Sequence, residues 1–118
     1  MNIILGKENL ETIDKRYVVL ELDTIRIKGS TDPVTAYCLI DELPLNEISV
    51  VAEYSELHNN LLRNYRKRNW NYCENAIEHL RGRWRGEVDS FYDSLTGRIQ
   101  DLRTATLESD WTGVVDKT

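Results

Sequence analysis

The chain is short of the features that mark several large classes of protein. It has only two cysteines and two prolines, and no apolar run near the roughly 18–20 residues that span a bilayer. Two cysteines are too few for a disulfide framework, so we expect a reducing compartment, the cytoplasm. The first residues, Met1–Lys7, lack the basic start and long apolar stretch of a signal peptide. These absences exclude a membrane-spanning protein, a collagen-like chain and a disulfide-rich toxin.

What the chain does have is a globular composition with its charge unevenly placed. Of its 118 residues, 41% are hydrophobic and 30% are charged, which fits one ordinary domain or two very small ones. The net charge is −5, yet residues 63–85 carry seven Arg or Lys against two Glu. This basic segment between acidic flanks is compatible with a surface that binds nucleic acid. It is equally compatible with ion pairing to the acidic ends of the same chain.

The first 40 residues have the pattern of strands. Ile3-Ile4-Leu5 is a short strand-like run, and Lys7–Asp14 suits one or two helical turns. From residue 17 to 27 apolar and polar residues alternate, and the alternation slips by one residue at Asp23-Thr24, which predicts a bulge or bend. Turn formers and a second strand at Val34–Ile40 complete a β-hairpin.

The rest of the chain is predicted to be helical. Three apolar stripes recur at spacings of three and four, as in helices that bury one face. The members of the stripes are Val50, Tyr54, Leu57, Leu61 and Tyr65; then Trp70, Cys73, Ile77, Leu80 and Trp84; then Val88, Tyr92, Leu95, Ile99 and Leu102. The tail after them is irregular, but we expect its Trp111 to dock on the helices. The predicted fold class is α+β: an N-terminal strand, a short helix and a β-hairpin, then an antiparallel unit of three helices.

Residues 21–37 contain the densest motif of the chain. They read E-L-D-T-I-R-I-K-G-S-T-D-P-V-T-A-Y and resemble the closing hairpin of bacterial class III adenylate/guanylate cyclase catalytic domains, approximately E-L-D-x-I-x-V-K-G-x-x-x-P-V-x-x-Y. The helical part resembles the tetratricopeptide-like tail that follows this domain in many bacterial members. Its Tyr-Arg-x-x-x-Trp segment is matched by Tyr65-Arg66 and Trp70, and its final W-x-G-V by Trp111–Val114. The resemblance spans nearly the whole chain.

This resemblance implies two parts: residues 1–41, the C-terminal part of a cyclase catalytic domain, and residues 42–118, the helical tail. The full-length protein would make a cyclic nucleotide for signal transduction. This segment would not be catalytic alone, because the family's two metal-binding aspartates and its Asn-x-x-x-Arg pair lie before the hairpin. We therefore expect no cofactor in this chain, while Mg²⁺ or Mn²⁺ is implied for the full-length enzyme. Asn59…Arg63 and Asn64…Arg68 have the Asn-x-x-x-Arg spacing but follow the hairpin, so we treat both as coincidence.

One site residue is carried over from the family. Lys28, before Gly29, occupies the position of the hairpin lysine that contacts the nucleotide triphosphate. An ammonium on a long flexible stem suits a phosphate, and a glycine lets ligand and backbone approach closely. The alternative is a solvated loop lysine. The resemblance leaves ATP and GTP both open. It implies as partners the remainder of the cyclase domain and a second cyclase subunit, because family sites form between two subunits.

A zinc site is a further hypothesis, since Cys38, His58, Cys73 and His79 are residue types that bind zinc. Their spacings match no compact ligand pattern, and both cysteines fall on apolar stripes. We expect no metal site in this chain.

The basic segment of residues 63–85 has the ingredients of a platform for single-stranded nucleic acid, because its cations alternate with aromatic residues. Trp70 and Trp84, however, share a helical stripe with Leu80, which is typical of core residues. We favour a solvated or ion-paired face, or a protein-docking face, over nucleic-acid binding. The cations are Arg63, Arg66, Lys67, Arg68, Arg81, Arg83 and Arg85.

The sequence thus favours the C-terminal segment of a class III nucleotidyl cyclase, with no contact to membrane or nucleic acid. The competing hypothesis is a non-catalytic helical module for protein interaction, in which the strands are only a scaffold. Either hypothesis leaves room for a protein partner on the helical tail.

Overall fold

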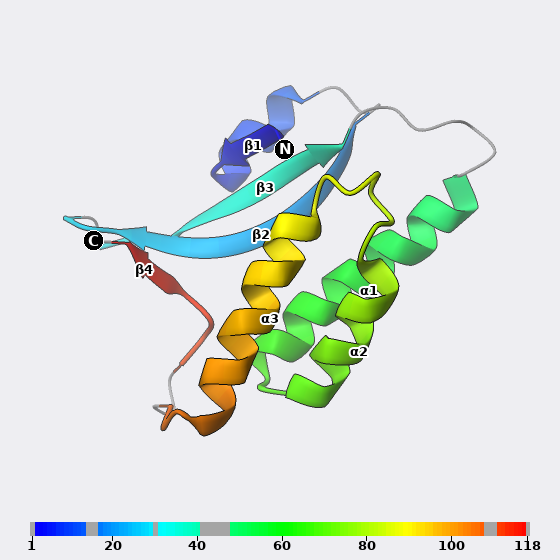
Figure 1. The fold of residues 1–118 in the computed structure, drawn as a ribbon. Helices are drawn as coiled ribbons and strands as arrows, with labels where there is room; N and C mark the ends of the chain where they lie inside the picture. The colour runs from blue at the N-terminus through cyan, green and yellow to red at the C-terminus, as the bar shows by residue number, and fades with distance from the viewer. Residues whose placement is uncertain (1, 14–16, 30, 41–47, 108–110, 118) are drawn as a thin grey trace.

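A computed structural model describes residues 2–13, 17–29, 31–40, 48–107 and 111–117. A sheet and a layer of helices lie face to face (Figure 1), so the fold belongs to the predicted α+β class. None of the helices in these ranges is long and apolar enough to cross a membrane. The elements in chain order are β1 (Asn2–Leu5), the 3₁₀ helix η1 (Lys7–Thr12), β2 (Val18–Ile27), β3 (Val34–Ile40), α1 (Ile48–Arg66), α2 (Trp70–Leu80), α3 (Asp89–Thr104) and β4 (Val115–Lys117).

The sheet has the strand order β1-β3-β2-β4, and the predicted hairpin is its β2–β3 pair. Glu21 pairs with Tyr37 and Thr24 pairs with Thr35, so β2 contains one more residue than β3 between these two pairs. This confirms the bulge predicted near Asp23. Strand β1 pairs antiparallel with β3, and β4 pairs parallel with β2. The sequence analysis did not predict β4. The tail that it described as irregular, residues 110–114, comes before this strand, and its described residues 111–114 have no regular secondary structure.

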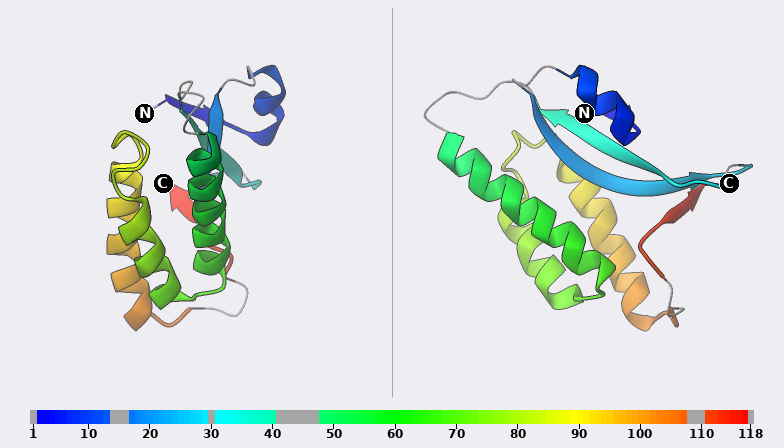
Figure 2. Two further views of the ribbon diagram at one scale, coloured as in Figure 1. Left: turned by 90° about the vertical axis from the view of Figure 1, so that its right-hand side faces the viewer. Right: turned by 180° about the vertical axis from the view of Figure 1, so that it is seen from behind.

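Helices α1 and α2 lie side by side, and α3 lies beside α2 (Figures 1 and 2). The stripe predicted for the third helix is confirmed, because Val88, Tyr92, Leu95 and Ile99 are fully buried. The prediction for Val50 is wrong: its side chain is 43% exposed, since the first turns of α1 project past the other helices (Figure 1).

Four members of the second helical stripe are buried as predicted and Trp70 is partly buried, but the helix that carries the stripe is shorter. Helix α2 ends at Leu80, and Gly82 follows with φ +81°, a left-handed conformation that ends helices. Trp84 therefore lies in the connection between α2 and α3. Its side chain is nevertheless only 2% exposed, because the connection folds the indole back onto Tyr54 of α1, with ring centroids 6.4 Å apart.

One hydrophobic core joins the strands to the helices. Leu20 and Leu22 of β2 and Cys38 and Ile40 of β3 are buried in the same cluster as the stripes of α1, α2 and α3. The expectation that Trp111 docks on the helices is confirmed, since its ring packs against Tyr65 and Trp70. Covering one sheet face with helices removes the weakness of an isolated hairpin.

Candidate functional site

Lys28 and Gly29 lie in the turn that joins β2 to β3, at the end of the hairpin away from the bulge. Gly29 has φ +88°, which L side chains rarely adopt, so the turn explains the glycine without any ligand. Lys28 is exposed. One solvated ammonium can attract a phosphate, but alone it provides little affinity, because water and salt screen its charge. A phosphate site here needs further groups from another chain segment.

At the bulge, two carboxylates of β2 bind arginines of the helical layer. Arg98 of α3 donates to both carboxylate oxygens of Asp23, each at 2.8 Å, and Arg66 at the end of α1 donates to Glu21 at 2.9 Å. The hydrogen bonds from Arg98 to Asp23 raise the pKa of the Arg98 guanidinium. The planar, two-point geometry is the strong form of this contact. These ion pairs fix the helices on the hairpin and neutralise the charges of all four side chains.

His58 of α1 is fully buried and was missed as a core residue by the sequence analysis. Its Nε2 lies 2.5 Å from the carbonyl oxygen of Glu21, which can only accept, so Nε2 carries the proton. Its Nδ1 therefore accepts from the Tyr92 hydroxyl, 2.8 Å away. That hydroxyl accepts in turn from the Trp84 indole nitrogen at 3.1 Å. The chain of donors links the α2–α3 connection, α3, α1 and the bulge of β2.

The His58 network is built for stability rather than for proton transfer. Burial lowers the pKa of His58 and raises the pKa of Tyr92, so both side chains are neutral at pH 7. Every hydrogen bond that this neutral tautomer needs is satisfied within the core. Because both ring nitrogens are occupied, His58 has no lone pair left for a metal ion.

The zinc candidates are not brought together. Cys38 and Cys73 are each buried, and desolvation raises the pKa of both thiols to about 11, which makes them poor metal ligands. Cys73 donates weakly to the carbonyl of Leu61, and His79 is exposed on α2. Within the described parts of the chain, no three His, Cys, Asp or Glu side chains form a group that could hold a metal ion.

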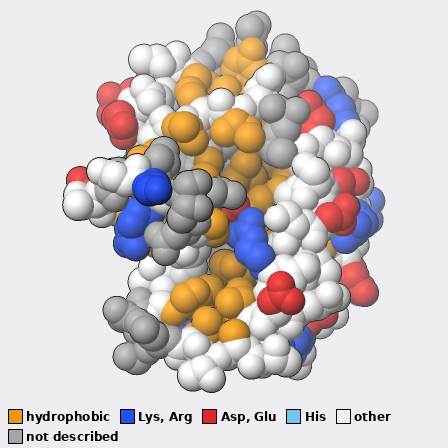
Figure 3. Space-filling model, turned by 60° about the vertical axis from the view of Figure 1, so that its left-hand side comes forward, with side chains coloured by type: hydrophobic (Ala, Val, Ile, Leu, Met, Phe, Trp, Pro, Cys, Tyr) orange, Lys and Arg blue, Asp and Glu red, His pale blue; other side chains and the backbone are white. Residues whose placement is uncertain are grey.

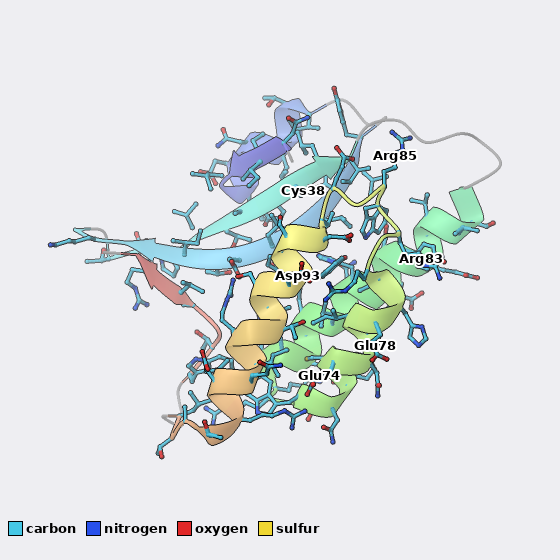
Figure 4. The ribbon with its side chains drawn as sticks, viewed as in Figure 1. Cys38, Glu74, Glu78, Arg83, Arg85 and Asp93 are labelled. Carbon is cyan, nitrogen blue, oxygen red and sulfur yellow. The ribbon has the colours of Figure 1, made fainter. Side chains whose placement is uncertain are left out.

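The cations of residues 63–85 are spread over several surfaces. Arg66 binds Glu21 across the layer boundary, and Arg81 binds Asp93 of α3. The Arg68 guanidinium lies over Trp111, 5.5 Å from the ring centroid, and that of Arg83 over Tyr54 at 5.2 Å. Arg83 and Arg85 lie at separate points of the α2–α3 connection (Figure 4). This arrangement resembles an ion-paired face more than a continuous platform for a polyanion.

We expect the chain to bind single-stranded RNA or DNA no more tightly than the 10⁻⁴–10⁻⁶ M that is typical of non-specific binding at physiological salt. The reason is the dispersal of the cations together with the net charge of −5. Fluorescence anisotropy at two salt concentrations measures this. Sub-micromolar binding that disappears in an Arg63→Gln, Lys67→Gln double variant would contradict the expectation, and these two exposed residues leave the contacts to Glu21 and Trp111 intact.

An apolar groove of about 380 Å³ opens between the sheet and α3. In register, Ile3 lies opposite Cys38 and Leu5 opposite Ala36, so both face the same side as the core. The helices do not cover this side of β1, and Ile3 and Leu5 are 54% and 49% exposed. Hydrophobic side chains gather in two areas of the face shown in Figure 3, with Lys or Arg side chains between them. The Asp23–Arg98 pair also lines the groove.

Comparison with known proteins found no matching family model, no matching curated protein and no matching solved structure.

Proposed function

We propose that this chain is the C-terminal segment of a class III nucleotidyl cyclase. The observation that carries the proposal is the agreement between the motif of residues 21–37 and the local fold. Its Lys-Gly pair falls at the turn, with Gly29 at φ +88°, and its two apolar stretches fall on β2 and β3. A motif gains weight when its residues lie in the local structure that their chemistry needs.

In this proposal, residues 1–41 complete a cytoplasmic catalytic domain and residues 42–118 form its tetratricopeptide-like tail. Lys28 contacts the triphosphate of ATP or GTP as a point charge, and the other phosphate ligands come from the remainder of the domain and from a second subunit. The exposure of Lys28 supports this role, because its ammonium is accessible to a ligand. The paired helices α1 and α2 provide the helical hairpin of the tail.

The proposal places the metal-binding aspartates of the family before the hairpin, so we assign no metal-dependent step to this segment. The acidic side chains at the bulge, Glu21 and Asp23, already bind Arg66 and Arg98. In this proposal the segment contributes nucleotide binding and structural support to the catalytic domain.

The groove beside β1 also supports the proposal. Contiguous exposed apolar side chains next to an edge strand mark a surface that another protein segment covers. Ile3 and Leu5 extend the core face of the sheet beyond the helices. A catalytic domain that packs a further segment on this face of β1 would bury them.

The test is a hybrid enzyme in which residues 1–118 replace the matching C-terminal region of an active bacterial class III cyclase. We expect the hybrid to make cyclic nucleotide with Mn²⁺. Lys28→Ala should raise KM for the nucleotide roughly 10- to 100-fold, the value of a charge-assisted hydrogen bond. Thr31→Ala, an exposed substitution in the same turn, is the matched control and should leave KM unchanged.

Two results would count against the proposal. One is a hybrid that is folded and dimeric but inactive, and the other is an active hybrid that does not respond to Lys28→Ala. The isolated chain should produce no cyclic nucleotide from ATP or GTP. Turnover by the isolated chain that is lost on Lys28→Ala would mean that a complete active site lies within these residues.

A further inference from the structure

The C-terminal tail returns from α3 to the sheet and contacts both layers of the fold. The indole of Trp111 packs edge-on against Tyr65 at 5.5 Å and against Trp70 at 5.8 Å between ring centroids. The guanidinium of Arg68 lies over the same indole. Tyr65, Arg68 and Trp70 form what we call the aromatic slot, which holds Trp111 where α1 ends and α2 begins.

Gly113, two residues after Trp111, has a left-handed backbone conformation. Its φ of +86° suits glycine, and a Cβ at this position would lie 3.3 Å from Cε2 of Tyr65. A side chain at Gly113 would therefore strain the backbone and also push against the slot. The two observations together explain why a glycine follows Trp111 at this spacing.

Beyond Gly113, β4 pairs with the outer edge of β2. Val115 pairs with Ile25 and Lys117 with Ile27, so the pairing ends one residue before Lys28. Figures 1 and 2 show the tail running from the end of α3, past the helices, to the Lys28 end of the hairpin. The bulge contacts of Glu21 and Asp23 hold the middle of β2, and Ile25 packs against the core. Strand β4 adds a contact from the helical side that reaches Ile27, the last residue of β2.

We propose that the tail is a strap through which the helical layer controls the order of the Lys28 turn. When Trp111 packs in the aromatic slot, β4 stays paired with β2 and the end of the hairpin stays ordered. When Trp111 leaves the slot, β4 separates from β2 and the end of the hairpin loses its order. The strap is held by one half-buried indole and a three-residue parallel strand, and contacts of this size belong to the parts of a protein that open first. The link to nucleotide affinity rests on the proposed function, whereas the link to hairpin order does not.

Amide hydrogen exchange on the whole chain tests the strap directly. Trp111→Ala removes two aromatic contacts. In this variant the amides at the start of β3, from Val34 onward, should exchange at least about tenfold faster than in the native chain. Strand β4 does not pair with β3, so this effect cannot come from the loss of β4 hydrogen bonds alone. Amides in the middle of α1 and α3 should change much less.

A pair of glycine variants provides the control. Gly113→Ala should speed exchange at the start of β3 in the same way, because of its φ and the contact with Tyr65. Gly97→Ala lies within α3, where a Cβ would meet nothing within 4 Å, and should leave the hairpin unchanged. Unchanged exchange at β3 in Trp111→Ala, or an equal rise across the helices and the hairpin, would overturn the strap.

In the hybrid cyclase, Trp111→Ala should raise KM for the nucleotide in the same direction as Lys28→Ala. If exchange responds while KM does not, the strap orders the hairpin but does not regulate the nucleotide site, and that part of the proposal is wrong. If Lys28→Ala itself has no effect on KM, the proposed function fails while the exchange result still decides whether the strap exists.

Discussion

Replacing Trp84 by alanine should lower the free energy of unfolding by about 3–5 kcal/mol, the cost of removing a buried aromatic side chain. Trp84 is 2% exposed, packs edge-on against Tyr54 and donates to the Tyr92 hydroxyl. A domain of this size has a total stability of about 5–15 kcal/mol, so much of it would be lost. Chemical denaturation, followed by circular dichroism, measures the change.

Two variants separate the reasons for this loss. Tyr72→Ala removes an aromatic side chain of the neighbouring helix that is 38% exposed, and should cost no more than about 0.5 kcal/mol. Trp84→Phe keeps most of the packing but removes the indole donor. Its cost in free energy of unfolding should therefore lie between the costs of Trp84→Ala and Tyr72→Ala. Equal, small effects of Trp84→Ala and Tyr72→Ala would show that Trp84 is exposed in solution, which would favour the nucleic-acid platform.

Replacing His58 by leucine should destabilise the fold and also remove a dependence of stability on pH. The carbonyl of Glu21 and the hydroxyl of Tyr92 would each lose a buried partner, at about 1–3 kcal/mol for each group left unsatisfied. In the native chain the pKa of His58 is lowered by burial, so below about pH 6.5 the unfolded chain binds a proton that the folded chain does not. Stability should therefore be fully present above that pH and fall as the pH drops, by up to about 1.4 kcal/mol per pH unit.

The comparison needs His58→Gln, whose amide can donate to the Glu21 carbonyl but does not titrate. This variant should be less destabilised than His58→Leu and should lack the loss of stability between pH 6.5 and 5.5. His79→Gln removes the exposed histidine of α2 and should keep that loss. A native pH profile that does not change when His58 is replaced would show that the imidazole is solvated in the folded chain.

The sequence was a good guide wherever apolar periodicity alone determines the structure. The slip in alternation at Asp23 predicted the bulge, because a buried strand face cannot tolerate a reversal of its side chains. The third helical stripe was also right, since Val88, Tyr92, Leu95 and Ile99 are fully buried. Lys28 was identified as a site residue from the resemblance alone. Apolar periodicity predicts neither the exposure of its side chain nor the turn in which it lies.

The failures concern features that depend on distant residues. His58 is polar and lies beside the predicted stripe of α1; its burial depends on Tyr92, 34 residues away, and on a carbonyl exposed by the bulge. Strand β4 has three residues and exists only because β2 presents an open edge. Val50 fits the spacing of its stripe, but periodicity gives the direction of a side chain and not the point at which neighbouring elements end.

The bulge also determines how far the hairpin reaches. Because it places two residues of β2 where β3 has one, deleting Asp23 would restore an unbroken alternation in which Leu22 and Ile25 stay on the same side. Such a shortened strand would keep its apolar face, yet it would lose the carboxylate that Arg98 binds and would draw Lys28 back by one strand residue, about 3.3 Å. The deletion of Asp23 is therefore limited by the distance from the helices to the turn rather than by the hydrophobic pattern.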